Sequence, residues 1–407
     1  MNSGGLAPNL PWHVLIVDDE PEVQELLQQE LSREGRCVVL APNDVDLGNL
    51  QAADLVLVDL TLERTNTDSD SSTPVAMRPL DGLALAAVLR SHVENSDNLR
   101  PLFALHTGYI NRLTPDLPAD VGEHVAARLN NLEWVFRKTD PATSAAFESE
   151  ILEAPLVSPY LLATGPTLPA RIRALASVAQ DTTDWVDLGP DSVENAVAEF
   201  LAIPATVEWF GTGYQDVRGC HPPLFELAAE TRGLAFLRWM LHRVLPYPCF
   251  LIDSQRLALR MRIRHEDLLS LLSGSASFAE AFDSVRYSGA LSGFVGPRWW
   301  RAGVEATLFE LAGGDLFDLA AMEQSLNDLA NRDLEYTPPG HVLNIGPDYQ
   351  PASTGPRSWS VRISPDDWPS FADQAFASID DVRSEDLLRR LVEVDDLPLV
   401  EEPPDAD

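Results

Sequence analysis

Cysteine is almost absent from this sequence of 407 residues, which holds only three. Cys37, Cys220 and Cys249 are odd in number, and none of them forms a Cys-x-x-Cys pair with another. This pattern argues against a disulfide framework and against a thiolate metal site, and it is typical of proteins in the reducing cytoplasm. We therefore expect a cytoplasmic protein.

Long apolar runs are also missing. No stretch approaches the roughly 18–20 uninterrupted apolar residues that a membrane span requires. The first residues, MNSGGLAPNLPWHVLIVDD, lack a basic region ahead of an apolar one, so we do not expect a secretory signal. We expect no membrane partner either.

Basic residues are scarce as well. The chain carries 29 basic and 63 acidic side chains, which gives a formal charge of −34. A field of this sign repels phosphate backbones, so general binding to nucleic acid or to anionic membranes is disfavoured. Lysine is the scarcest charged residue, because Lys138 is the only one and every other basic residue is arginine.

What the sequence does contain is a change of pattern near residue 155. At about 100–200 residues per domain, the chain is long enough for two or three domains. Residues 1–155 alternate short β-branched runs with helical patterns, which predicts a parallel sheet covered by helices on both faces. The expected strands are 13–17, 37–40, 54–59, 102–106 and 132–137, and the expected helices are 22–33, 81–93 and 119–130.

Helical patterns dominate residues 156–392, with a small β element near 341–363. The segment 393–407 holds seven acidic residues and no basic one, which predicts a disordered acidic tail. The polar segment 62–80 predicts an inserted loop. The expected helices of this second region are 169–180, 192–202, 223–245, 255–273, 276–287, 302–333 and 380–392.

Polar side chains stand at the carboxyl ends of four of the expected strands: Asp18, Asp19, Asp59, Thr107 and Lys138. In an open parallel sheet, ligands bind at this edge, where the strand order reverses. In the order 2-1-3-4-5 three carboxylates would meet there, and their repulsion would raise their pKa values unless a cation such as Mg²⁺ relieved it. A carboxylate in such a place can attack a phosphoryl donor, while a metal ion, a lysine and a hydroxyl neutralise the transferring oxygens.

The segments around these residues resemble the receiver domain of two-component response regulators. The resemblance rests on LIVDDEPEVQELLQQEL, LVLVDL, PLDGLAL, the Thr107-Gly108 step and VFRK, and it covers about residues 10–155. It implies a flavodoxin-like, doubly wound α/β fold and a histidine kinase or phosphotransfer protein as the phosphoryl donor in a phosphorelay. Taken alone, Asp18 and Asp19 could instead cap the helix that starts near Pro21.

The resemblance implies a role for each of these side chains. Asp59 is the expected phospho-acceptor, Thr107 is expected to hydrogen-bond the phosphoryl group, and Lys138 is expected to pair with it. A Mg²⁺ cofactor is expected to be held by Asp18, Asp19, Asp59 and the main-chain carbonyl of Thr61. Val135 stands where the family typically has an aromatic residue that couples to the threonine, so the output side of the switch departs from the pattern.

A cluster of basic residues stands out between residues 232 and 264. It contains one acid, Asp253, and seven arginines: Arg232, Arg238, Arg243, Arg256, Arg260, Arg262 and Arg264. Three interpretations are open. The arginines pair with carboxylates of the chain itself, they form a protein-docking face, or they contact DNA through a helix-turn-helix that begins in RLALRMRIRHEDLLSLL.

We interpret the chain as a response regulator that is phosphorylated on Asp59 and transmits the signal through residues 156–392. Transmission would proceed by contact with an unknown protein partner after a shift between receiver states. Self-dephosphorylation of a receiver is a weak activity, and we do not class the chain as an enzyme. Two alternatives stay open: a DNA-binding regulator using the arginine cluster, and an enzyme gated by the receiver, which would require a deep pocket with convergent polar groups.

Overall fold

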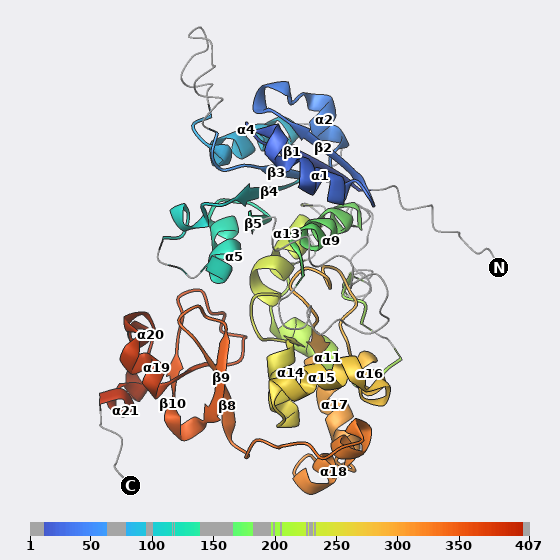
Figure 1. Ribbon diagram of the computed structural model, residues 1–407, viewed down its shortest axis with the longest axis vertical. Coiled ribbons are helices and arrows are strands. Elements are labelled where there is room, and N and C mark those ends of the chain that lie inside the picture. The colour runs from blue at the N-terminus through green and yellow to red at the C-terminus, as the bar shows by residue number, and fades with distance from the viewer. Residues whose placement is uncertain are drawn as a thin grey trace, which may run out of the picture.

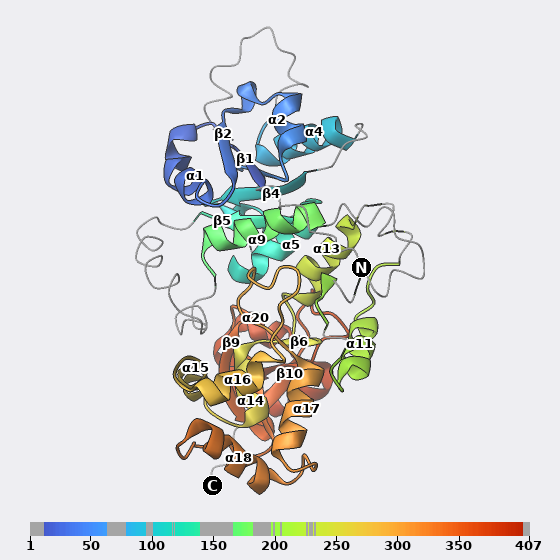
Figure 2. The same ribbon diagram turned by 90° about the vertical axis from the view of Figure 1, so that its right-hand side faces the viewer.

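A computed structural model describes residues 12–62, 79–94, 101–115, 117, 119–138, 166–181, 197, 200–203, 206–224, 227, 231 and 233–401. Figure 1 shows a parallel sheet in blue to teal at the top of the molecule, above a helical region and a second, C-terminal sheet. Figure 2 shows the same arrangement after a quarter turn. The expected helix 192–202 and the expected loop 62–80 fall largely outside the described residues.

The parallel sheet has five strands in the order β2-β1-β3-β4-β5, and every neighbouring pair is parallel. Their bounds are β1 (His13–Val17), β2 (Arg36–Leu40), β3 (Leu55–Val58), β4 (Leu102–Thr107) and β5 (Trp134–Arg137). All residues of β1, β3 and β4 are buried, because helices cover both faces of the sheet. The expected α/β architecture with a five-stranded parallel sheet is therefore confirmed.

The two faces of this sheet are covered by different helices. The first face packs against α1 (Glu25–Leu31) and α9 (Leu168–Asp181), and the second against α2 (Leu47–Ala52), α4 (Gly82–Glu94) and α5 (Ala119–Leu129). Short turns of 3₁₀ helix connect these elements at η1 (Pro21–Gln24), η2 (Pro42–Asp44) and η4 (Ile110–Arg112). Helix α9 lies beyond residue 155, so the buried core of the parallel sheet includes residues of the second region, 156–392.

The helical region surrounds a small antiparallel pair of strands, β6 (Leu251–Ile252) and β7 (Trp299–Trp300). Its helices are α11 (Phe210–Gly219), α13 (Leu234–Trp239), the π-helix η7 (Met240–Val244), α14 (Ser254–Met261), α15 (His265–Gly274), α16 (Ala276–Asp283), α17 (Arg301–Leu311) and α18 (Leu319–Ala330). Aromatic rings fill the centre, and Trp300 packs against Trp209, Phe250 and Tyr287.

Two long helices expected in this region are each broken in two. Arg262 adopts a left-handed conformation with φ 61°, which ends α14 and separates it from α15. Gly313 and Gly314 adopt φ values of 67° and 92° and lie between α17 and α18. Because a residue with positive φ cannot continue a right-handed helix, one helix ends before each of these positions and the next begins after it.

The C-terminal sheet has four strands in the order β10-β11-β8-β9. They are β8 (His341–Ile345), β9 (Pro351–Pro356), β10 (Ser360–Ile363) and β11 (Ala375–Ser378), so the β element extends beyond the expected range 341–363. One 3₁₀ turn, η8 (Arg357–Trp359), joins β9 to β10. The remaining elements are α19 (Ile379–Ser384), α20 (Asp386–Arg390), η9 (Val394–Asp396) and α21 (Leu397–Glu401).

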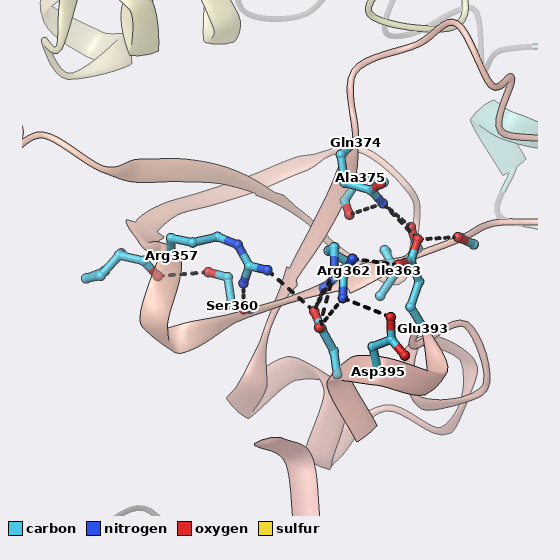
Figure 3. Close-up of polar contacts among 11 residues, drawn as sticks. Arg357, Ser360, Arg362, Ile363, Gln374, Ala375, Glu393 and Asp395 are labelled. Carbon is cyan, nitrogen blue, oxygen red and sulfur yellow. Dashed lines mark hydrogen bonds and ion pairs between the residues drawn. The ribbon is translucent and has the colours of Figure 1, made fainter. Parts of the chain in front are cut away.

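The expectation of a disordered tail over 393–407 is wrong for its first part. Residues 394–401 form η9 and α21, and Asp396 is buried. Its carboxylate accepts hydrogen bonds from the amide of Arg362 at 2.7 Å and from Nη2 of Arg362 at 2.7 Å. Figure 3 shows Arg362 of β10 between Glu393 and Asp395, with which it also forms ion pairs. Residues 402–407 lie outside the described part of the chain.

None of the helices within the described residues combines the length and the apolar character needed to cross a bilayer.

Candidate functional site

The strand ends of the parallel sheet bring the expected acidic residues together. Val17, the last residue of β1, pairs with Val58, the last residue of β3, so the residues that follow are neighbours across the sheet. One carboxylate oxygen from each of Asp18, Asp19 and Asp59 lies within 4.8 Å of the others. These three residues, together with Thr107 and Lys138, are called the strand-end site below.

Asp18 is held rigidly in place. Its side chain is almost completely buried, and its amide donates to the carbonyl of Leu40 at 3.1 Å. Oδ1 accepts from the amide of Glu20 at 2.8 Å, and Oδ2 accepts from Nε2 of Gln24 at 2.6 Å. Asp18 therefore closes a two-residue turn after β1. It does not cap the following helix, whose N-cap residue is Glu20.

Lys138 bridges the two buried acids of the strand-end site. Its Nζ lies 3.0 Å from Oδ2 of Asp59 and 3.2 Å from Oδ2 of Asp18. The amide of Lys138 donates to the carbonyl of Thr107 at 2.9 Å, which extends the pairing of β4 and β5 to their carboxyl ends. The backbone thus fixes the origin of the lysine side chain, and the ammonium reaches across β4 to the acids of β1 and β3.

For both Asp59 and Lys138, burial and the charge of the partner shift the pKa in opposite directions. Burial raises the pKa of Asp59 above its usual range, although the nearby charge of Lys138 and a hydrogen bond from the amide of Thr61 lower it in part. Burial alone would lower the pKa of Lys138, but the charges of Asp59 and Asp18 outweigh it and raise that pKa. The lysine therefore stays protonated between the two carboxylates.

Thr107 is fully buried at the end of β4. Its Oγ1 accepts a hydrogen bond from the amide of Tyr109 at 3.0 Å, which leaves the hydroxyl able to donate its own proton to another group. The neighbouring His106 is also buried, and burial together with the charge of Lys138 lowers the pKa of His106 to about 3. A neutral imidazole therefore adds no positive charge beside the lysine.

Two contacts of the strand-end site were not predicted from the sequence. Gln24 holds Asp18 from the turn after β1, and no pattern distinguishes it from other polar residues of that segment. Gly82, within the segment PLDGLAL, packs directly on the backbone of Asp59: a Cβ at Gly82 would lie 1.8 Å from the carbonyl oxygen of Asp59. Its position in a segment already used for the resemblance was the signal that could have found it.

The donor set suits a hard divalent cation. Three carboxylates against one ammonium leave an excess of negative charge, and carboxylate oxygens are preferred ligands of Mg²⁺. Asp18, Asp19 and Asp59 supply side-chain oxygens. Thr61, whose carbonyl was the fourth expected ligand, lies next to them, since its amide binds Asp59.

The arginine cluster lies elsewhere and is mostly paired within the chain. Arg256 pairs with Asp253, Arg260 with Glu305, Arg262 with Glu323, Arg264 with Asp267 and Arg238 with Glu133. Arg243 is exposed, and Arg232 lies outside the described residues. Arg238 is the member that contacts the sheet region, because Glu133 directly precedes β5.

Residues at the ends of four strands form the strand-end site. Its acids come from the ends of β1 and β3, and its hydroxyl and ammonium come from the ends of β4 and β5. No protein-family model, curated protein or solved structure matches the chain.

Proposed function

We propose that this chain is a response regulator whose N-terminal, flavodoxin-like receiver accepts a phosphoryl group on Asp59. The observation that carries the proposal is the convergence of Asp18, Asp19 and Asp59 with the only lysine of the chain. A structural role alone does not require three carboxylates within 4.8 Å of one another, since their repulsion opposes folding. A site that transfers a phosphoryl group to an aspartate with the help of Mg²⁺ can use all three, one as the nucleophile and the others as metal ligands.

In the proposed reaction, one oxygen of Asp59 attacks the phosphorus atom of the donor. An O–P bond forms, and the P–N bond of a phosphohistidine, or the P–O bond of a small donor, breaks. The leaving group departs with its electron pair: the imidazole of a phosphohistidine donor takes up a proton, and the acetate of acetyl phosphate leaves as the anion. Mg²⁺ held by Asp18, Asp19, Asp59 and the carbonyl of Thr61 would supply positive charge to the phosphoryl oxygens.

Lys138 and Thr107 respond to the new group. Before transfer, the lysine ammonium contacts the carboxylate of Asp59. After transfer, that oxygen belongs to an acyl phosphate, and the ammonium pairs with a phosphoryl oxygen instead. The hydroxyl of Thr107 donates to a second one. Because Thr107 ends β4 and Lys138 follows β5, these two new contacts displace the carboxyl ends of both strands.

Strand β5 is the proposed route to the helical region. Trp134 stacks on His242, and its ring also meets Phe294 edge to face at 4.8 Å. Phe136, which is on β5 as Trp134 is, also packs against Phe294. A shift of β5 therefore changes the packing of the helical region, which would present a new surface to a protein partner.

The test is phosphorylation of the full chain with acetyl phosphate and Mg²⁺, followed by intact-mass measurement. One phosphoryl group should attach, and hydroxylamine should remove it, as it does any acyl phosphate. Asp59→Asn should abolish the added mass. Asp44→Asn, which alters an exposed acid on η2, should leave it unchanged. A phosphorylated Asn variant, or a wild-type chain that no donor modifies, would overturn the proposal.

The DNA-binding alternative has less support. Five arginines of the cluster are engaged by carboxylates of the same chain, and an engaged guanidinium must break that pair before it can bind phosphate. The enzyme alternative gains one observation, which is a cavity with convergent polar groups. Its lining comes partly from α5 and β5, so it lies between the two regions rather than within 156–392.

A further inference from the structure

A cavity of about 590 Å³ lies where three parts of the chain meet. Its walls come from α5 and β5, from the helical region at 245–256 and 294–298, and from the loops of the C-terminal sheet at 349–351 and 365–368. In Figure 1, α5 lies between the parallel sheet and the C-terminal sheet. Cavities of about 300–1,000 Å³ are typical of small-molecule sites.

One positive charge in this cavity is not neutralised by an ion pair. Asp253 accepts from the amide of Arg256 at 2.8 Å and also from its guanidinium, so its two oxygens are used by one arginine. Arg298 lines the same wall, and its Nη1 donates to the carbonyl of Pro297 at 3.2 Å. No carboxylate of the described residues forms an ion pair with Arg298. Burial lowers the pKa of Arg298, with Asp253 opposing this effect and Arg256 adding to it.

The other buried charged side chains of the cavity form ion pairs with one another. Arg171 pairs with Glu123 at 2.6 Å. Asp367 accepts from the hydroxyl of Tyr247 at 2.5 Å and pairs with both His124 and Arg128. Asp366 is exposed, so water screens its carboxylate. Among the described residues, Arg298 is therefore the guanidinium of the cavity that forms no ion pair. The nearby charge of Asp253 offsets the effect of burial only in part, and an anion would pair with the guanidinium.

Aromatic residues line much of the remaining wall: Tyr349 and Trp368 are partly exposed and Tyr247 keeps a small exposed area, whereas Trp134 and Phe294 are almost completely buried. Several already contact one another, with Tyr247 edge to face against Trp368 at 5.4 Å. Rings arranged in this way favour a planar guest, because a flat ring can stack on one wall and meet others with its edge.

We propose that this cavity binds a small molecule that combines a planar aromatic ring with an anionic group. The anion pairs with the guanidinium of Arg298, and the ring lies against the aromatic wall. A nucleoside monophosphate and an aromatic carboxylate share this chemistry. The test therefore includes one ligand of each class.

Isothermal titration calorimetry of the full chain would use adenosine monophosphate, 4-hydroxybenzoate, adenosine and inorganic phosphate as probes. At least one aromatic anion should bind with a stoichiometry of one. Adenosine and phosphate, which carry only half of the required chemistry, should bind at least tenfold more weakly. Binding of the monophosphate alone identifies a phosphate anion, and binding of the benzoate alone identifies a carboxylate.

Arg298→Gln should weaken the aromatic anion at least tenfold. The matched control is Arg286→Gln, which removes a partly exposed arginine paired with Asp283 outside the cavity lining and should bind as wild type does. Failure of all probes to bind, or an unchanged affinity in Arg298→Gln, would overturn the proposal.

A second measurement on the wild type protects the test against a variant that fails to fold. Hydrogen exchange with and without the bound anion should show protection at 294–298 and 366–368. Protection confined to other segments contradicts the site. The residues that line this cavity are distinct from Asp18, Asp19 and Asp59 of the strand-end site, so a failure to bind would leave the proposed function intact.

Discussion

At the scale of single residues, close contact decides which positions tolerate change. Gly82 has no room for a side chain beside Asp59, whereas a Cβ at Gly108 would meet nothing within 4 Å. Both glycines lie next to the strand-end site, one at the start of α4 and one directly after Thr107. They form a natural pair for comparison.

Gly82→Ala should therefore destabilise the chain by about 1–3 kcal/mol, because the backbone of Asp59 or of α4 must move. Phosphorylation of Asp59 should slow as well, since the nucleophile moves with its backbone. Urea denaturation and acetyl phosphate labelling would measure the two effects. Gly108→Ala should change the free energy of unfolding by less than about 0.5 kcal/mol. Equal stability of the two variants would contradict the packing argument.

Lys138→Arg tests shape at constant charge. The ammonium reaches Asp59 and Asp18 as a compact group, and the planar guanidinium is larger and forked. Phosphorylation should persist to a large extent, but the activated conformation should not form. Hydrogen exchange over residues 101–138, with and without beryllofluoride, would measure this. The control Arg112→Lys alters a ring contact with Tyr109 and should respond as wild type does. A wild-type response in Lys138→Arg would show that the lysine is not the switch contact.

Some residues of the site could be predicted from sequence and others could not. Asp18, Asp59 and Lys138 stand at the ends of apolar strands, and parallel strands end at one edge of a sheet. No comparable sequence pattern identifies Gln24 or Arg298, because their roles depend on which distant segments fold beside them.

At the scale of elements, the buried strands were predictable and the breaks were not. Apolar runs located all five parallel strands, since burial on both faces requires continuous apolar sequence. The break at Arg262 lies inside an amphipathic pattern and needs a left-handed arginine, which sequence periodicity does not reveal. Strand β9, with the sequence PASTGP, forms because β8 offers an edge and not because its residues favour strands.

The C-terminal helix α21 depends on one buried carboxylate. Hydrogen bonds from Arg362 lower the pKa of Asp396, while burial raises it in part. The ionised form is therefore favoured by folding, and the stabilisation is present above the usual aspartate pKa of about 3.9. It is lost as the pH falls through the lowered pKa of the folded state.

Amide protection over 394–401 should accordingly disappear in acid. Asp396→Asn should lose much of that protection already at pH 7. Its neighbour Asp395 is 83% exposed and lies 3.7 Å from Arg362, so Asp395→Asn should behave as wild type. Hydrogen exchange on the full chain would make the comparison. Undiminished protection in Asp396→Asn at pH 7 would show that apolar contacts alone hold the segment.

At the scale of the whole molecule, one buried carboxylate ties the sheet region to the helical region. Glu133 is 1% exposed and accepts from Arg90 of α4, from Arg238 of α13 and from the amide of Phe103 at 2.5 Å. Glu34 makes a comparable link to Arg173 of α9, but its side chain is 60% exposed.

Glu133→Gln should cost about 3–5 kcal/mol, because two arginines lose a buried partner. Glu34→Gln should cost about 0–1 kcal/mol, since solvent screens an exposed pair. Urea denaturation followed by tryptophan fluorescence would compare them. A small loss in Glu133→Gln would mean that water replaces the carboxylate and that the two regions are joined by apolar packing alone.

The scarcity of lysine has a chemical consequence for the molecule as a whole. Any reagent or enzyme that acylates lysine side chains finds a single target in this chain, and that target is the side chain that bridges Asp18 and Asp59. The side chain of Lys138 is 30% exposed, so solvent reaches it. Acylation would remove its charge and add bulk between two acids. Lysine-directed modification of this chain, wherever it occurs, is therefore modification of the strand-end site and of nothing else.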